Sequence, residues 1–152
     1  MNRKNDTAIG KAKKSDLPAI KKLLAELTNA MGDTEGIDVG IALETCEQLL
    51  NEARSYFLMA TAQESPVGFI HFTIRQTVLH RGPSAMIDEL VVTKEYREKG
   101  IGKQLVLATL ETCKRLGCCE VEVSTEKTND KARKFYKKCG FEERGILFEA
   151  EL

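Results

Sequence analysis

Residues 87–106 constrain the fold of this chain more than any other stretch. They read as a strand with two acidic residues, Asp88 and Glu89, then a short loop with Gly100 and Gly102, and directly after it a helix. Backbone N–H groups at a helix start are unpaired, and the helix dipole adds positive charge there. The basic residues of the loop and first turn are Arg97, Lys99 and Lys103. We therefore expect a phosphorylated ligand at this position.

Length and composition favour one compact domain spanning residues 1–152. Of the 152 residues, 42% are hydrophobic and 30% are charged, which argues against a disordered chain. Lys+Arg and Asp+Glu balance at 23 each, so no global basic field would hold nucleic acid or an anionic membrane. The apolar runs are too short to span a membrane, and residues 1–6 lack the apolar core of a signal peptide. We expect a cytoplasmic protein without nucleic-acid or membrane partners.

The cysteines support the same compartment. An odd number of them without a framework favours a reducing environment. They are Cys46, Cys113, Cys118, Cys119 and Cys139. Adjacent cysteines do not have a metal-ligand spacing, and two histidines leave little for a zinc site, so we expect no metal. We interpret the cysteines as small core hydrophobes.

The apolar periodicity along the chain predicts the element order β-α-α-β-β-β-α-β-α-β. Strands are expected over residues 7–13, 56–62, 67–78, 85–92, 120–125 and 141–149. Helices are expected over residues 17–31, 39–50 and 129–139, and from Gly102 to Gly117. The early hairpins imply antiparallel pairing, whereas the strand–helix–strand unit over 85–125 implies one parallel pair with a right-handed crossover. The fold class is therefore α+β.

Two common phosphate-binding motifs do not fit the loop. A P-loop would need glycine where Arg97 stands and serine or threonine where Gln104 stands. The dinucleotide fingerprint would need a third glycine at Leu105. What remains is Arg-x-x-Gly-x-Gly over residues 97–102.

This loop, the strands around it and the segment N-D-K-A-R-K-F-Y-K-K-C-G-F over residues 129–141 resemble the GNAT family of acetyl-CoA-dependent N-acetyltransferases. The predicted element order of the whole chain is also that of the family. The resemblance implies a GNAT fold with a single mixed, mostly antiparallel sheet and helices on both faces. It also implies a parallel strand pair splayed at the cofactor site. A homodimer is common in the family, and the last strand offers an edge for pairing.

The resemblance also implies roles for individual residues. Backbone groups of Leu90, Val91 and Val92 would meet the pantetheine arm of acetyl-CoA. Loop amides of Glu98, Lys99, Gly100, Ile101, Gly102 and Lys103 would bind the pyrophosphate, with Arg97 nearby. Asn129 would lie near the cofactor arm, and Tyr136 would protonate the leaving thiolate. A carboxylate at Asp88 or Glu89 would serve as base or amine ligand.

The chemistry of acetyl transfer needs such groups. An alkyl ammonium has a pKa near ~10.4 and must lose a proton before it attacks, which Asp88 or Glu89 can accept directly or through water. We favour Asp88, but strand alternation leaves the choice open because a bulge would exchange the two faces. Tyr136 can donate its hydroxyl proton, or it can be a core tyrosine. His71 is interpreted as a structural strand histidine.

The early helices would line the acceptor site, and their acidic residues would attract a cationic amine. These residues are Asp33, Glu35, Asp38, Glu44 and Glu47. The same residues can instead be helix caps and surface charge. The predicted function is direct acetyl transfer, in a ternary complex, to a small-molecule amine, amino acid, polyamine or aminoglycoside. The alternatives are a protein or peptide amine acetyltransferase, a non-catalytic acetyl-CoA-binding module, a structural domain, and transfer through an acetylated Cys139.

Overall fold

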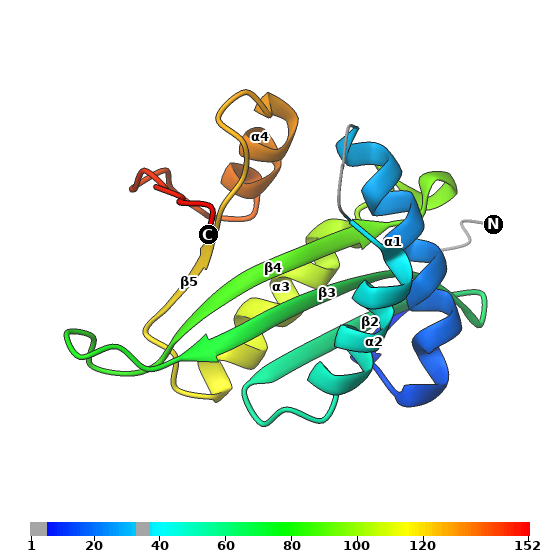
Figure 1. The fold of residues 1–152 in the computed structure, drawn as a ribbon, viewed down its shortest axis with the longest axis horizontal. Coiled ribbons are helices and arrows are strands. Elements are labelled where there is room, and N and C mark those ends of the chain that lie inside the picture. Colours follow the sequence, from blue (N-terminus) through cyan, green and yellow to red (C-terminus); the bar gives the residue numbers. More distant parts are fainter. Residues whose placement is uncertain (1–5, 33–36) are drawn as a thin grey trace.

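The computed structural model describes residues 6–32 and 37–152, which form one sheet flanked by helices (Figure 1). The described strands are β1 (Thr7–Lys11), β2 (Ser55–Ala62), β3 (Ser65–Arg75), β4 (Ser84–Val92) and β5 (Glu120–Val123). The described helices are α1 (Leu17–Met31), α2 (Val39–Leu49), α3 (Ile101–Arg115) and α4 (Asp130–Lys138), with 3-10 turns η1 (Lys14–Asp16) and η2 (Lys94–Tyr96).

The sheet has the order β1-β2-β3-β4-β5 and confirms the mixed topology expected from the sequence. The first four strands pair antiparallel with their neighbours, and α3 carries the chain across to the parallel strand β5. The hairpin between β2 and β3 closes at Gln63 and Glu64, whose φ angles are 49° and 63°. Positive φ at both central residues suits the twist of a two-residue hairpin.

Helices cover both faces of the sheet, as the resemblance implied. On one face α1 buries Ile20 and Leu23, and α2 buries Cys46, against strand residues such as Phe69 and Val91. On the other face α3 buries its own apolar stripe against the sheet (Figure 1). Members of this second core include Ile70, Phe72, Ile101, Leu105 and Val106. Consecutive residues of β3 therefore serve different cores, which fixes its register.

The predicted last strand over residues 141–149 is wrong. Residues 141–152 contain neither strand nor helix. Glu143 is paired with Arg133 at 2.7 Å and with Lys137 at 3.4 Å, which ties the start of the segment to α4. Alternating apolar residues form a strand only where a second strand lies beside them, because the backbone N–H and C=O groups need hydrogen-bond partners. Ile146 and Phe148 remain 83% and 89% exposed.

Candidate active site

The sheet opens between β4 and β5. The two parallel strands pair only from Ser84 opposite Glu120 to Ile87 opposite Val123, although β4 continues to Val92. After β5 the chain turns away toward α4 (Figure 1). Among the described strands, the end of β4 therefore has a neighbour only on the β3 side. The backbone of Leu90, Val91 and Val92 lies at this open end, where edge N–H and C=O groups can bind another partner.

The glycine loop leads directly into α3. Gly100 is the N-cap residue of α3 and has φ of 83°, a left-handed conformation that favours glycine. The N–H of Gln104 donates to the carbonyl of Gly100 at 3.0 Å and begins the helical hydrogen bonds. The N–H groups of Ile101, Gly102 and Lys103 precede that bond and have no helical acceptor. They form the kind of helix N-terminus that binds anions.

Gly102 brings three elements together. A Cβ added to this residue would lie 3.4 Å from Cζ of Phe135 on α4 and 3.9 Å from Cγ2 of Val92 on β4. The second glycine of the loop therefore allows α4 to pack against the first turn of α3. Glycine thus serves here for the close approach of a neighbouring helix.

The charged side chains of the loop are partly engaged within the protein. The Arg97 guanidinium donates to the carbonyl of Val92 at 2.8 Å and lies 3.8 Å from Glu26. The Lys99 ammonium lies 4.8 Å from the ring centroid of Tyr96, and Glu98 lies 3.6 Å from Lys131. The Arg97 contacts hold the start of the loop against β4 and α1.

A β-bulge interrupts β4 at its two acidic residues. His71 of β3 lies opposite Glu89, whereas the next residue of β3 lies opposite Ile87, so Asp88 is an extra residue without a cross-strand partner. Asp88 accepts a hydrogen bond from Thr73 at 3.0 Å, and Glu89 binds His71 at 2.6 Å. His71 and Thr73 are two residues apart on β3 and share one face. The bulge therefore brings both carboxylates to the same face of the sheet.

The face that carries the carboxylates is the one covered by α1 and α2. The His71 ring stacks on Phe57, a member of that core, with centroids 4.2 Å apart. Its Nε2 atom lies 2.9 Å from the Ser55 hydroxyl, and its Nδ1 atom faces Glu89. Ser55, His71 and Glu89 thus form one hydrogen-bonded row across β2, β3 and β4.

Asp88 has the surroundings of a proton acceptor. Burial raises the pKa of its carboxyl, and the neighbouring charge of Glu89 raises it further. The hydrogen bond from Thr73 and the proximity of His71 act in the opposite direction without cancelling the rise. The side chain is 33% exposed, so it remains accessible to an acceptor or to water.

Tyr136 lies on α4 near the same junction. Its ring makes edge-on contacts with Phe135 and Phe141, at centroid distances of 5.0 and 5.6 Å. Burial raises the pKa of Tyr136 to about 12, with a smaller contribution from the nearby Cys139. The side chain is therefore a neutral hydroxyl donor at physiological pH.

Asn129 and two acidic residues of the early helices, which the sequence placed near the ligands, bind other groups of the protein in the structure. Asn129 is the N-cap of α4 and accepts from the N–H of Ala132 at 3.0 Å. Among the acidic residues of the early helices, Asp38 caps α2 through Gly40 and Ile41, and Glu47 pairs with Lys14 at 2.5 Å. Asp33 and Glu35 lie outside the described residues.

The three buried cysteines do not have the environment of nucleophiles. Burial raises the pKa of the Cys139 thiol, and the Lys103 charge lowers it only in part. Burial also raises the pKa of Cys46 to about 11 and of Cys113 to about 12. A thiolate is the reactive form, so these thiols are poorly suited to carry an acetyl group.

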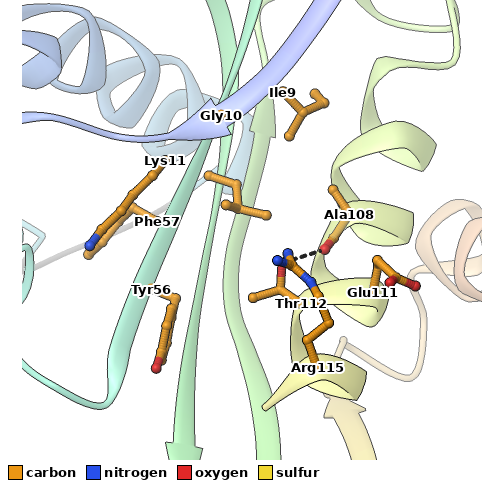
Figure 2. Close-up of a pocket in the computed structure, with 10 residues that line it drawn as sticks. Ile9, Gly10, Lys11, Tyr56, Phe57, Ala108, Glu111, Thr112 and Arg115 are labelled. Atoms are coloured by element: carbon orange, nitrogen blue, oxygen red, sulfur yellow. Dashed lines mark hydrogen bonds between the residues drawn. The ribbon is translucent and has the colours of Figure 1, made fainter.

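A cavity of about 400 Å³ lies away from this junction, between β1, β2 and α3 (Figure 2). Its lining residues include Ile9, Tyr56, Ala108 and Arg115. Arg115 is turned toward Thr112 of its own helix, to which it donates at 3.3 Å. None of the residues predicted for cofactor or catalysis lines this cavity.

Over residues 6–32 and 37–152, no group of three or more His, Cys, Asp or Glu side chains could hold a metal ion. None of the helices in these ranges is both long and apolar enough to cross a membrane.

Glu26 was not predicted from the sequence, and His71 was given only a structural role. Glu26 of α1 accepts from the Thr93 hydroxyl at 2.7 Å and from the N–H of Lys94 at 3.0 Å, which fixes the end of β4. These partners are 67 and 68 residues away along the chain, so no local pattern marks them. His71 is 5% exposed, as a structural histidine would be, but its partner is a candidate site carboxylate.

The sequence of the chain is similar to those of known acetyltransferases. The model of the Acetyltransferase (GNAT) family matches residues 18–141. N-alpha-acetyltransferase 30 from Schizosaccharomyces pombe is 37% identical over 75 residues, which cover 48% of this chain and 50% of the relative. The chain spans about half the length of the first curated relatives it matches.

Solved structures share the fold over nearly the whole chain. An aminoglycoside acetyltransferase from an uncultured soil metagenomic sample, in complex with trehalose, has a TM-score of 0.80 at 27% identity and covers 99% of both chains. The aminoglycoside N-acetyltransferase AAC(6')-Iy in complex with CoA has a TM-score of 0.84 at 23% identity, covers 99% of this chain and 98% of its own, and shows the fold alone. With the family model matching most of its length, the chain belongs to the GNAT family of acetyltransferases.

Proposed function

We propose that the chain is an acetyl-CoA-dependent N-acetyltransferase that transfers an acetyl group directly to a primary amine in a ternary complex. The observation that carries the proposal is the bulge in β4. It puts Asp88 and Glu89 on one face, immediately before the open end of the same strand. A proton acceptor and a cofactor-binding edge are therefore neighbours, and membership of the GNAT family supports this assignment.

The residues present fit an acyl-CoA. The open end of β4, from Leu90 to Val92, offers backbone groups to the pantetheine amides. The first N–H groups of α3 and the ammonium groups of Lys99 and Lys103 suit the pyrophosphate. When bound, acetyl-CoA supplies the acetyl group as a thioester.

In this proposal two side chains move protons. Asp88 accepts a proton from the acceptor ammonium and leaves a neutral amine with a lone pair. Tyr136 donates its hydroxyl proton to the departing thiolate. The raised pKa of Asp88 favours the first role, because a carboxylate of higher pKa is a stronger base.

The acceptor proposed is a small cationic amine such as a polyamine, an amino acid or an aminoglycoside. Two adjacent carboxylates on one face favour a positively charged acceptor. The name of one similar structure, an aminoglycoside acetyltransferase, points the same way. The name of one relative, an N-alpha-acetyltransferase, favours a peptide amine as the second candidate.

A thiol-release assay with acetyl-CoA and a panel of polyamines, amino acids, aminoglycosides and peptides tests the proposal. We expect turnover of at least one small cationic amine. Acetyl-CoA at about 100 times its Kd should stabilise the fold by about 2.7 kcal/mol, which raises Tm by roughly 5–10 °C. Turnover of peptides alone would move the acceptor class to proteins. A thermal shift without turnover would identify a non-catalytic acetyl-CoA-binding module. The absence of both the thermal shift and turnover would indicate a structural domain.

A cytoplasmic location is part of the proposal. All five cysteines are free thiols in the structure. Free thiols without disulfides suit a reducing compartment, where acetyl-CoA is used.

We also propose that the chain forms a homodimer through its last segment. Ile146, Leu147 and Phe148 are 83%, 63% and 89% exposed, and β5 pairs only with β4 among the described strands. An apolar segment and a free sheet edge on one molecule can each be covered by a second copy.

Ile146→Asp with Phe148→Asp should therefore convert a dimer to a monomer in light scattering. Val78→Asp, at a 99% exposed position outside this surface, is the control; a wild type that is monomeric at micromolar concentration would refute the dimer.

A further inference from the structure

Two adjacent carboxylates raise a question of roles that the sequence leaves open. Asp88 and Glu89 share a face, and both have an oxygen within 4 Å of Nδ1 of His71, at 3.9 and 2.6 Å. One ammonium group, with three N–H donors, could therefore contact both carboxylates. Their surroundings differ, and His71 is the main source of the difference.

His71 is held in one orientation from three sides. Phe57 stacks on its ring with an interplanar angle of 16°, and Ser55 lies 2.9 Å from its Nε2. When the Ser55 hydroxyl donates to Nε2, the ring proton of neutral His71 is on Nδ1 and points to Glu89. The remaining titratable neighbours of this row are Asp88 on β4 and, from α2, Cys46, whose thiol is buried near Glu89.

The two carboxylates therefore differ in their hydrogen bonds. Glu89 has the 2.6 Å contact with His71, a short hydrogen bond to an imidazole nitrogen that fixes the position of the carboxylate. Oε2 makes that contact, and the 42% exposed side chain leaves Glu89 accessible for a second partner. Asp88 accepts from the Thr73 hydroxyl at 3.0 Å, a longer contact than that of Glu89.

We infer that His71 is a positioning residue that assigns different roles to the two carboxylates. It holds Glu89 as the charged anchor for the acceptor ammonium and leaves Asp88 as the group that takes the proton. One proton passes from the ammonium nitrogen to an Asp88 oxygen, directly or through a water. The products are a neutral amine and a neutral carboxylic acid, which returns the proton to solvent after the transfer. The inference rests on the proposed function and assigns its acceptor site.

Steady-state kinetics with the best amine of the panel test the inference. If Glu89 anchors the amine and His71 acts through it, Glu89→Gln and His71→Leu each raise KM for the amine by about 10- to 100-fold. We expect kcat and KM for acetyl-CoA to change less than about threefold. His71→Leu combined with Glu89→Gln should be no worse than Glu89→Gln alone, because residues that act as one unit are not additive.

His71→Asn separates positioning from simple loss of a buried ring. Its amide N–H can still donate toward Glu89, so the variant should recover most of the KM lost in His71→Leu. His80→Gln, on the connection between β3 and β4, is the matched control and should match wild type. Additive losses in the double variant, or no recovery in a folded His71→Asn, would overturn the inference and leave the proposed function standing. A wild type that acetylates no amine would overturn both.

Discussion

An Asp88→Asn variant is expected to lose about 100- to 1,000-fold in kcat while it still binds acetyl-CoA. Asparagine has nearly the shape of aspartate and can still accept the hydrogen bond from Thr73, but it cannot take a proton. General-base catalysis contributes about 10²- to 10⁴-fold in enzymes, and solvent water can replace part of it. Initial rates at saturating amine and acetyl-CoA measure the loss. A thermal shift with acetyl-CoA shows that cofactor binding is retained.

The pH dependence provides a second test of Asp88. Its pKa is raised, chiefly by burial, and only the ionised form accepts a proton. The kcat/KM of the wild type should therefore fall as pH decreases through a value above the ordinary range for aspartate. Asp88→Asn should lose this limb. Glu52→Gln makes the same carboxylate-to-amide change at an exposed position outside the site. This variant should keep the wild-type rate and the fall of kcat/KM at low pH. An Asp88→Asn variant with a wild-type rate would assign the proton to another group.

The sequence predicted most elements of this fold because their signals are local. The apolar stripes of α1 and α3 and the turn at Gln63 and Glu64 are short-range patterns, and each appears where expected. The bulge shows in the packing rather than in the sequence, because residues 85–87 and 90–92 are all apolar. Ala85 and Ile87 join the core under α3, and Leu90 and Val92 pack against the same core, so the alternation shifts by one residue in between. Because of that shift, Asp88 and Glu89 lie on the same face of the sheet. Strict alternation along the strand had left their faces open.

The functional assignment of His71 depends on contacts that no local pattern contains. Its partners Ser55 and Glu89 are 16 and 18 residues away and lie on separate strands. A strand histidine between apolar residues looks the same whether its partner is a carbonyl or a site carboxylate. The predicted strand over 141–149 fails for the related reason that pairing is a property of two segments. Its apolar residues resemble a strand, but Glu143 is paired with α4 and no ladder forms.

The second large effect is expected at Tyr136. Its pKa of about 12 makes it a poor acid for a thiolate in water, since a thiol in water has a pKa near ~8.5. The mismatch of about 3.5 pKa units would make the transfer uphill by roughly 5 kcal/mol. Burial raises the pKa of thiols as well, however, and the buried Cys113 thiol reaches about 12. A thiolate that left a site as dry as the surroundings of Tyr136 would therefore have a pKa closer to that of the Tyr136 hydroxyl.

Tyr136→Phe removes this hydroxyl and keeps the ring that packs against Phe135 and Phe141. We expect kcat to fall about 10- to 100-fold with little change in either KM, because the hydroxyl acts when the thiolate departs. Tyr56→Phe removes the hydroxyl of a tyrosine that stacks on Phe72 elsewhere in the sheet, and it should retain the wild-type rate. A seleno analogue of acetyl-CoA provides the deciding measurement. A selenolate needs a proton less than a thiolate does, so the loss in Tyr136→Phe should shrink with this donor. An equal loss with both donors would mean that Tyr136 supports packing rather than proton transfer.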